Sequence, residues 1–197
     1  MKRRQMLAAI AAAAAAPAAL AAEASGAPKK VWPKVPEGWY GEGMYQDLAK
    51  DGTGVTAPGT EGLPTAYIAF DPQCPWCEKL HRAATPLYSK VRIIWCPVAV
   101  LNINSEPQGS MILSASDPWK KFLEHEDHFH DAAFRGLPVD QKEVWKLPEK
   151  IRAKVWTNSK IVRRNGTRTI PFGVFRTAKG EYLSLIHISE PTRLDVI

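Results

Sequence analysis

The sequence predicts an α/β domain in which short buried strands alternate with helices. Three apolar runs carry the prediction, because a short unbroken run of apolar residues is typical of a buried strand. The runs span residues 65–70, 91–101 and 169–175. The first run leads into a stretch with helical periodicity, and several further helical patterns separate the second run from the third. One core is expected, since residues 22–182 suffice for a single domain.

The first run and the helix after it meet at a Cys-x-x-Cys motif. Residues 65–70 are apolar, β-branched and aromatic, whereas residues 78–87 are good helix formers with apolar positions at a helical spacing. Cys74 therefore falls at the start of the helix. Free backbone N–H groups and the positive end of the helix dipole favour a thiolate there, which lowers the thiol pKa from about 8.5 toward neutrality or below.

The spacing of the motif gives each of its residues an expected role. Cys74 is the predicted nucleophile, and Cys77, one turn further along, is within disulfide reach and can resolve a mixed disulfide. Pro75 fits the first helical turn, where its missing N–H has no cost. Trp76 lies between the cysteines and is expected at the surface that meets substrate, where an apolar side chain suits unfolded polypeptide.

A zinc site and a structural disulfide are the alternatives to a redox-active pair. A zinc site needs two more ligands, and Cys96 with a histidine is the visible supply. A purely structural disulfide would close too small a loop to stabilise much. Cys96 is expected to be a buried inert thiol of the second strand, the alternative being a redox or metal partner of the motif. The histidines of residues 125–130 are expected at a solvated helix end, because adjacent side chains point to different faces.

Residues 70–77, Phe-Asp-Pro-Gln-Cys-Pro-Trp-Cys, and residues 169–175, Thr-Ile-Pro-Phe-Gly-Val-Phe, together resemble the thioredoxin superfamily. Within it, the sequence is most similar to the catalytic domain of the periplasmic DsbC/DsbG disulfide isomerase and reductase family, above all its DsbG-like members. The resemblance covers residues 65–182. It implies a thioredoxin-like fold with a helical insertion at about residues 105–160.

The resemblance also implies site residues. Cys74 matches the attacking cysteine, Cys77 the resolving one and Pro171 the cis-proline that faces the disulfide. Ile170 would then offer its backbone to an extended substrate chain. The isomerases usually carry threonine at this position, whereas isoleucine is the residue of thioredoxin itself. Apolar Ile68 occupies the place of thioredoxin's buried acid.

The N-terminal residues 1–21 are expected to be a signal peptide. Lys2, Arg3 and Arg4 precede an alanine-rich apolar core that is too short and too weakly apolar for a good membrane anchor. The pattern predicts export to the periplasm by a general secretory or a twin-arginine signal. Residues 22–64 are rich in glycine and proline and are expected to be a linker or loosely packed arm. They are too few for the family's dimerisation domain, which favours a monomer.

Between the second and third strands, a helix is expected over residues 106–116, a second beginning at Asp117 and Pro118, and later helices over 142–160 that are broken at Pro148. These helices would cover the active-site face. Residues 183–197 resemble the translation of a transposon-based sequencing-library adapter, so we expect a non-native tail. The closing strand and helix of the fold would then be truncated after Tyr182.

Composition limits the remaining classes of function. The net charge is +6, and the basic residues are spread rather than clustered, so no nucleic-acid partner is expected. No cofactor is expected either. The predicted function is an exported thiol:disulfide oxidoreductase that acts on proteins or peptides with cysteines and is kept reduced by a membrane thiol–disulfide donor. The alternatives are a DsbA-like oxidant and a non-enzymatic metal-binding or metallochaperone domain.

Overall fold

The computed structural model describes residues 41–131, 133–167 and 169–184. The expected signal peptide (1–21), the first part of the expected arm (22–40) and most of the adapter-like tail (185–197) lie outside the described residues. The strands are β1 (Thr65–Phe70), β2 (Arg92–Pro97), β3 (Phe172–Arg176) and β4 (Tyr182–Ser184). The helices are α1 (Gly41–Asp51), α2 (Pro75–Ala84), α3 (Ser105–Ser114), α4 (Pro118–Asp127), α5 (Gln141–Val144) and α6 (Glu149–Arg164), and a 3-10 turn (Thr85–Leu87) follows α2.

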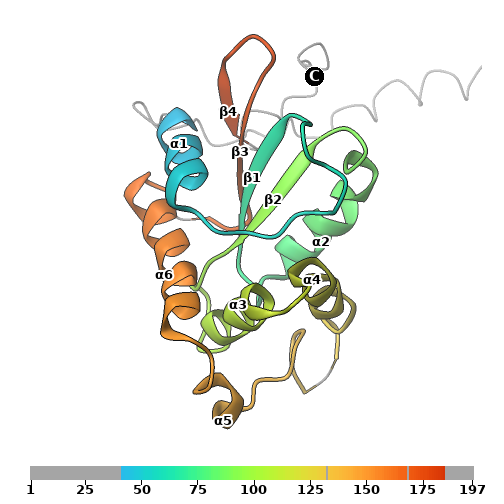
Figure 1. The fold of residues 1–197 in the computed structure, drawn as a ribbon, viewed down its shortest axis with the longest axis vertical. Coiled ribbons are helices and arrows are strands. Elements are labelled where there is room, and N and C mark those ends of the chain that lie inside the picture. Colours follow the sequence, from blue (N-terminus) through green and yellow to red (C-terminus); the bar gives the residue numbers. More distant parts are fainter. Residues whose placement is uncertain (1–40, 132, 168, 185–197) are drawn as a thin grey trace, which may run out of the picture. The chain divides into compact units, whose positions relative to one another are not determined.

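The strands form one sheet in the order β2-β1-β3-β4 (Figure 1). Strands β1 and β2 are parallel, with Ile68 opposite Trp95, and α2 makes the crossover that parallel neighbours require. Strand β3 runs antiparallel to β1, and β4 runs antiparallel to β3. The three predicted strands are confirmed, and the second is shorter than its apolar run because it ends at Pro97.

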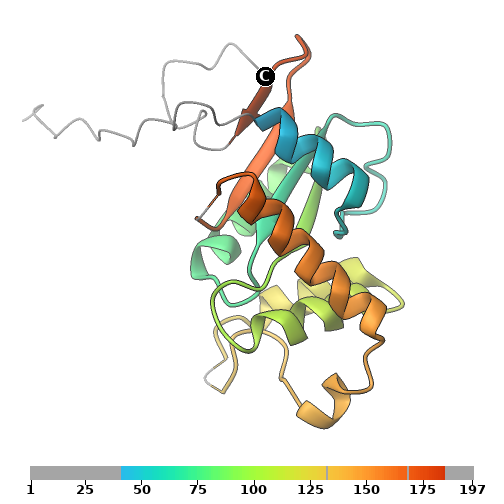
Figure 2. The same cartoon turned by 90° about the vertical axis from the view of Figure 1, so that its left-hand side faces the viewer.

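Successive side chains of β1 point to opposite faces of the sheet, so the core is divided between these two faces. Ile68 and Phe70 belong to one cluster, which helices α2, α3 and α4 complete, whereas Ala69 belongs to a second cluster with residues of α1 and α6. Figures 1 and 2 show α1 and α6 together on one face and α2 on the other. The Cys-x-x-Cys motif is part of the first cluster.

The helical insertion agrees with its sequence pattern. Helix α3 covers most of the expected residues 106–116, and α4 begins where Asp117 accepts a capping hydrogen bond from the Lys120 backbone N–H at 2.9 Å. The expected break at Pro148 separates α5 from α6.

The segment from residue 41 to the first strand differs from the loosely packed arm expected for residues 22–64. Met44 and Leu48, one helical turn apart on α1, are 0% and 1% exposed and lie in the second core cluster. Val55 then exchanges two backbone hydrogen bonds with Trp95 of β2, at 2.9 and 2.8 Å. These residues are therefore part of the folded domain.

The last strand forms at the start of the adapter-like segment. In β4, Leu183 pairs with Phe175 and Ser184 with Val174, so these residues supply the hairpin partner that the truncated fold was expected to lack. Tyr182 and Leu183 suit a strand by their β propensity. The final helix of the expected fold would fall beyond residue 184, outside the described residues.

Candidate redox-active site

The Cys-x-x-Cys motif occupies the junction between β1 and α2. Cys74 is the N-cap residue of α2, with extended backbone angles, and Pro75 is in the first turn as predicted. The Cys74 backbone N–H donates to the Asp71 carbonyl at 2.9 Å, and the Cys77 N–H donates to the Cys74 carbonyl at 3.0 Å. Both cysteines carry free thiols and are buried. The predicted position of Cys74 at the helix start is confirmed.

The two thiols have opposite tendencies to ionise. The side-chain hydrogen bond from Cys77 is the largest influence on Cys74 and, with the backbone N–H groups of Cys77 and Trp76, lowers the pKa of Cys74 to about 6 against the opposing effect of burial. Burial, followed by the hydrogen bond and charge of Cys74, raises the pKa of Cys77 far above its usual range. The pair therefore combines a reactive thiolate with a protonated neighbour.

The segment before β3 brings a distant residue to the reactive sulfur. The peptide bond between Ile170 and Pro171 is cis, and the Ile170 carbonyl accepts a hydrogen bond from the Cys74 thiol at 3.6 Å. Both residues are half-buried. The structure thus brings Cys74, Cys77 and Ile170 together at one end of the sheet.

The surface around the motif is open on the side of Pro75 and Trp76. The Trp76 side chain is 66% exposed, and the Lys79 ammonium lies 4.5 Å from the centre of its ring. A cavity of about 590 Å³ adjoins Pro75, and its walls include Phe129 and Arg135 from the segment after α4. The insertion therefore contributes directly to the surface beside the cysteines.

A buried amide connects the motif to the insertion. The Gln73 side chain donates to Gln108 Oε1 at 2.6 Å and to the Arg135 carbonyl at 2.8 Å, and its own oxygen accepts from Asn102 at 3.1 Å. Sequence reasoning missed this contact, because a glutamine before a cysteine motif gives no signal of burial and glutamines are mostly exposed.

His125 makes a second connection and corrects part of the expectation of a solvated helix end at residues 125–130, because His125 and Glu126 are buried whereas Asp127, His128 and His130 are exposed as expected. His125 is fully buried, and burial lowers its pKa. Its Nδ1 accepts from the Leu137 N–H at 3.2 Å, so Nε2 carries the proton that it donates to the Pro72 carbonyl at 2.8 Å. Gly136 is required beside it, since its φ is +81° and a Cβ would lie 2.1 Å from the imidazole ring.

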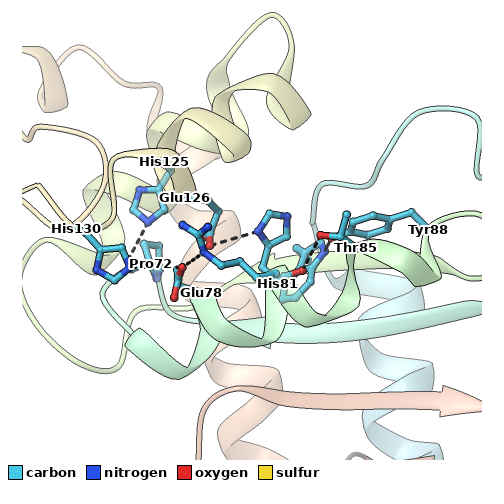
Figure 3. A network of polar contacts seen from close by, with 10 residues as sticks. Pro72, Glu78, His81, Thr85, Tyr88, His125, Glu126 and His130 are labelled. Atoms are coloured by element: carbon cyan, nitrogen blue, oxygen red, sulfur yellow. Dashed lines mark hydrogen bonds and ion pairs between the residues drawn. The ribbon is translucent and has the colours of Figure 1, made fainter.

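Polar side chains of α2 lie against the insertion (Figure 3). His81 Nδ1 lies 3.5 Å from Glu126 Oε2 on α4, and both side chains are buried. Glu78 forms an ion pair with Arg82 and lies 3.5 Å from His130 Nε2. Burial alone would raise the pKa of Glu78, but the hydrogen bond and charge of Arg82 outweigh it and lower the pKa. Helix α2 therefore contacts the insertion through the side chains of Glu78 and His81.

Cys96 is separate from the motif. It is fully buried on β2, it belongs to the other core cluster, and burial raises its pKa to about 12. Across residues 41–131, 133–167 and 169–184, no group of three or more His, Cys, Asp or Glu side chains is arranged to hold a metal ion. None of the helices in these ranges is long and apolar enough to cross a membrane.

No family model matches the chain. In sequence, it is 24% identical over 141 residues to the thiol:disulfide interchange protein DsbG of Pseudomonas aeruginosa, an alignment that covers 70% of this chain and 52% of DsbG. The chain thus spans about half the length of the curated relative that it matches.

In structure, the chain resembles the catalytic domain of Proteus mirabilis ScsC, with a TM-score of 0.55 at 18% identity over 73% of this chain and 89% of that domain. It also resembles ScsC of the same organism in a compact conformation, with a TM-score of 0.53 at 18% identity over 72% of this chain and 70% of that one. The chain therefore has a thioredoxin-like fold, and its sequence is similar to that of a DsbG thiol:disulfide interchange protein.

Proposed function

We propose that the chain is an exported thiol:disulfide oxidoreductase that reduces or isomerises disulfide bonds in polypeptide substrates, in the manner of DsbG. The pairing of the two thiols at the start of α2 carries the proposal. With a pKa of about 6, Cys74 is mostly thiolate at pH 7, whereas Cys77 keeps its proton.

The two cysteines divide the reaction between them. The Cys74 thiolate attacks one sulfur of a substrate disulfide, forming a mixed disulfide and releasing the other substrate sulfur as a thiolate. Cys77 then loses its proton and attacks the Cys74 sulfur, which releases the second substrate thiolate and leaves a Cys74–Cys77 disulfide. The substrate gains two electrons and the enzyme loses them. In isomerisation, a substrate thiolate attacks the mixed disulfide instead.

Four residues around the sulfur are proposed to bind substrate. Pro75 and Trp76 are exposed beside Cys74 and offer apolar surface to an unfolded chain. Ile170 and Pro171 lie against the Cys74 thiol, where the backbone of an extended substrate segment can pair with the chain.

The proposed function also includes a location, an oligomeric state and an electron donor. We propose that the protein acts in the periplasm as a monomer, and the signal-peptide pattern expected at residues 1–21 supports the location. The Cys74–Cys77 disulfide must be reduced again by two electrons, and a membrane thiol–disulfide protein is the proposed donor.

The equilibrium of the Cys74–Cys77 couple with a glutathione redox buffer tests the function. A potential of about −270 mV indicates a thioredoxin-like reductant, and one between about −120 and −200 mV indicates an oxidant or an isomerase. An absence of any reversible disulfide would contradict the proposal.

Cys77→Ser distinguishes an oxidoreductase from a metal-binding domain. Without the resolving thiol, mixed disulfides with substrate should accumulate at Cys74, visible as adducts on a non-reducing gel. A metal site would instead lose bound zinc and trap nothing. Cys96→Ser is the matched control and should form no such adducts.

A further inference from the structure

Asp71 is a buried carboxylate next to the motif that the proposed reaction does not use. It directly follows β1 and is 0% exposed. A charge so deeply buried is costly unless hydrogen bonds replace its lost hydration. The Asp71 carboxylate therefore needs several hydrogen-bond donors from the protein.

Four donors surround the Asp71 carboxylate, two on each oxygen. Oδ1 accepts from the Gln73 backbone N–H at 2.9 Å and from the Ser105 hydroxyl at 2.7 Å. Oδ2 accepts from the backbone N–H groups of Val100 and Leu101, at 2.8 and 3.0 Å. Every acceptor site of a carboxylate anion is thereby used. No site is left for a proton from Cys77, so the geometry does not suit a general base.

The donors come from two segments, the turn that carries the motif and the loop after β2 with the start of α3. Gln73 belongs to the turn that carries Cys74, and the Cys74 N–H itself donates to the Asp71 carbonyl. Val100, Leu101 and Ser105 belong to the loop after β2 and the start of α3. One side chain therefore ties the reactive turn to the loop of residues 100–105.

The charge of Asp71 also acts on the cysteines. It opposes the ionisation of both and raises the pKa of Cys74 and of Cys77, although for each thiol it is smaller than the effects of burial and of the other cysteine. The backbone hydrogen bonds of the helix start and the contact between the two thiols do not involve the carboxylate. The effect of the Asp71 charge is therefore distinct from the effect of those contacts.

We propose that Asp71 is a positioning residue of the redox site: its carboxylate anchors the turn of Cys74 to the loop of residues 100–105, and its fixed negative charge restrains the reactivity of Cys74. The proposal deepens the function proposed above and rests on it.

Asp71→Asn tests the charge, with alkylation of Cys74 by iodoacetamide followed against pH in a Cys96→Ser background. Losing a nearby negative charge should move the midpoint of the alkylation profile below about 6. An unchanged midpoint, or a higher one, would overturn the role of the charge.

Two matched variants separate charge from packing. Ser105→Ala removes one donor and keeps the charge, so the midpoint should stay at about 6. Asp117→Asn removes a carboxylate that also accepts a backbone N–H, but at the exposed start of α4, and should likewise leave the midpoint unchanged. A shift in either variant as large as in Asp71→Asn would contradict a specific effect of Asp71.

Amide hydrogen exchange in the unaltered protein tests the anchor even if Asp71→Asn does not fold. The Gln73, Val100 and Leu101 amides should exchange at least tenfold more slowly than the amide of exposed Ile103. Equal rates would overturn the anchoring role. The glutathione equilibrium of the same protein distinguishes the two proposals. A missing reversible disulfide would overturn the proposed function, whereas the alkylation midpoint and the amide exchange rates test the role of Asp71.

Discussion

At the scale of single residues, the pKa of Cys74 depends most on the side chain of Cys77, three positions further along the chain. A helix start alone accounts for part of its lowered pKa, but the thiol of Cys77 provides the largest influence. The resolving cysteine therefore has a second effect before any disulfide forms, because it prepares its partner for attack.

Replacing Cys77 should show this effect. Cys77→Ala removes the donor, so the pKa of Cys74 should rise from about 6 toward the usual thiol value of about 8.5, and the alkylation midpoint should move with it. Cys77→Ser keeps a hydroxyl donor, and its midpoint should lie between those of Cys77→Ala and the unaltered protein. Identical midpoints in all three would contradict the role given to the Cys77 thiol.

His125 should make stability depend on pH. Burial holds its pKa below the unfolded value of about 6.5, so the unfolded chain takes up a proton first as the pH falls. Its contribution is therefore complete above about pH 6.5 and is lost as the pH falls toward the folded pKa. His125→Gln should cost about 1–3 kcal/mol at pH 7.5, because the Leu137 N–H loses its acceptor, and should weaken the loss of stability between pH 7.5 and 5.

Urea unfolding at both pH values measures this difference. The control is His128→Gln, since the His128 side chain is exposed and its hydrogen bond is to the exposed Asp131. An unaltered pH dependence in His125→Gln would show that other groups cause it.

At the scale of elements, Asn158 holds three segments together. It is a fully buried residue of α6 that accepts from the Thr53 N–H at 3.0 Å and donates to the carbonyls of Thr53 and Pro97, at 2.8 and 2.9 Å. One amide thus fastens α6 to the end of β2 and to the chain after α1. The Asn158 amide thus pairs with both the N–H and the carbonyl of Thr53, a residue that lies outside the strands.

Asn158→Ala should leave these backbone groups buried without partners. We expect a loss of about 2–4 kcal/mol in the free energy of unfolding, measured with urea. Lys160→Ala, at an exposed position of the same helix, should change it by less than about 0.5 kcal/mol. Equal values for the two variants would mean that the Asn158 contacts do not stabilise the fold.

At the scale of the whole molecule, the domain begins before its first strand. Met44→Ala and Leu48→Ala should each cost about 2–5 kcal/mol, because both side chains are fully buried against the sheet. The exposed Lys50 provides the control, and Lys50→Ala should have little effect. If thermal or urea unfolding showed only a small loss in the free energy of unfolding, the expectation of a loosely packed arm would be supported instead.

The same contrast shows how far the sequence predicts this fold. Strand β1 could be predicted because its apolar run is unbroken, and Cys74 and Cys77 because their spacing carries a chemical meaning. Helix α1 could not, since it buries few apolar side chains within a polar segment. The contacts of Gln73 and His125 join residues 35 and 53 positions apart, and nothing in the local pattern indicates such partners.

The bridge between Val55 and Trp95 has a consequence for aggregation. Strand β2 is one of the two outer strands of the described sheet, and an outer strand with free backbone groups is a template onto which another extended chain can add. Val55 occupies those groups at Trp95, and Gly54 permits the close approach, since a Cβ there would lie 2.6 Å from the Trp95 carbonyl oxygen. At Trp95 this edge is therefore closed to the unfolded chains that are the proposed clients, and a client strand cannot pair with the sheet at that point.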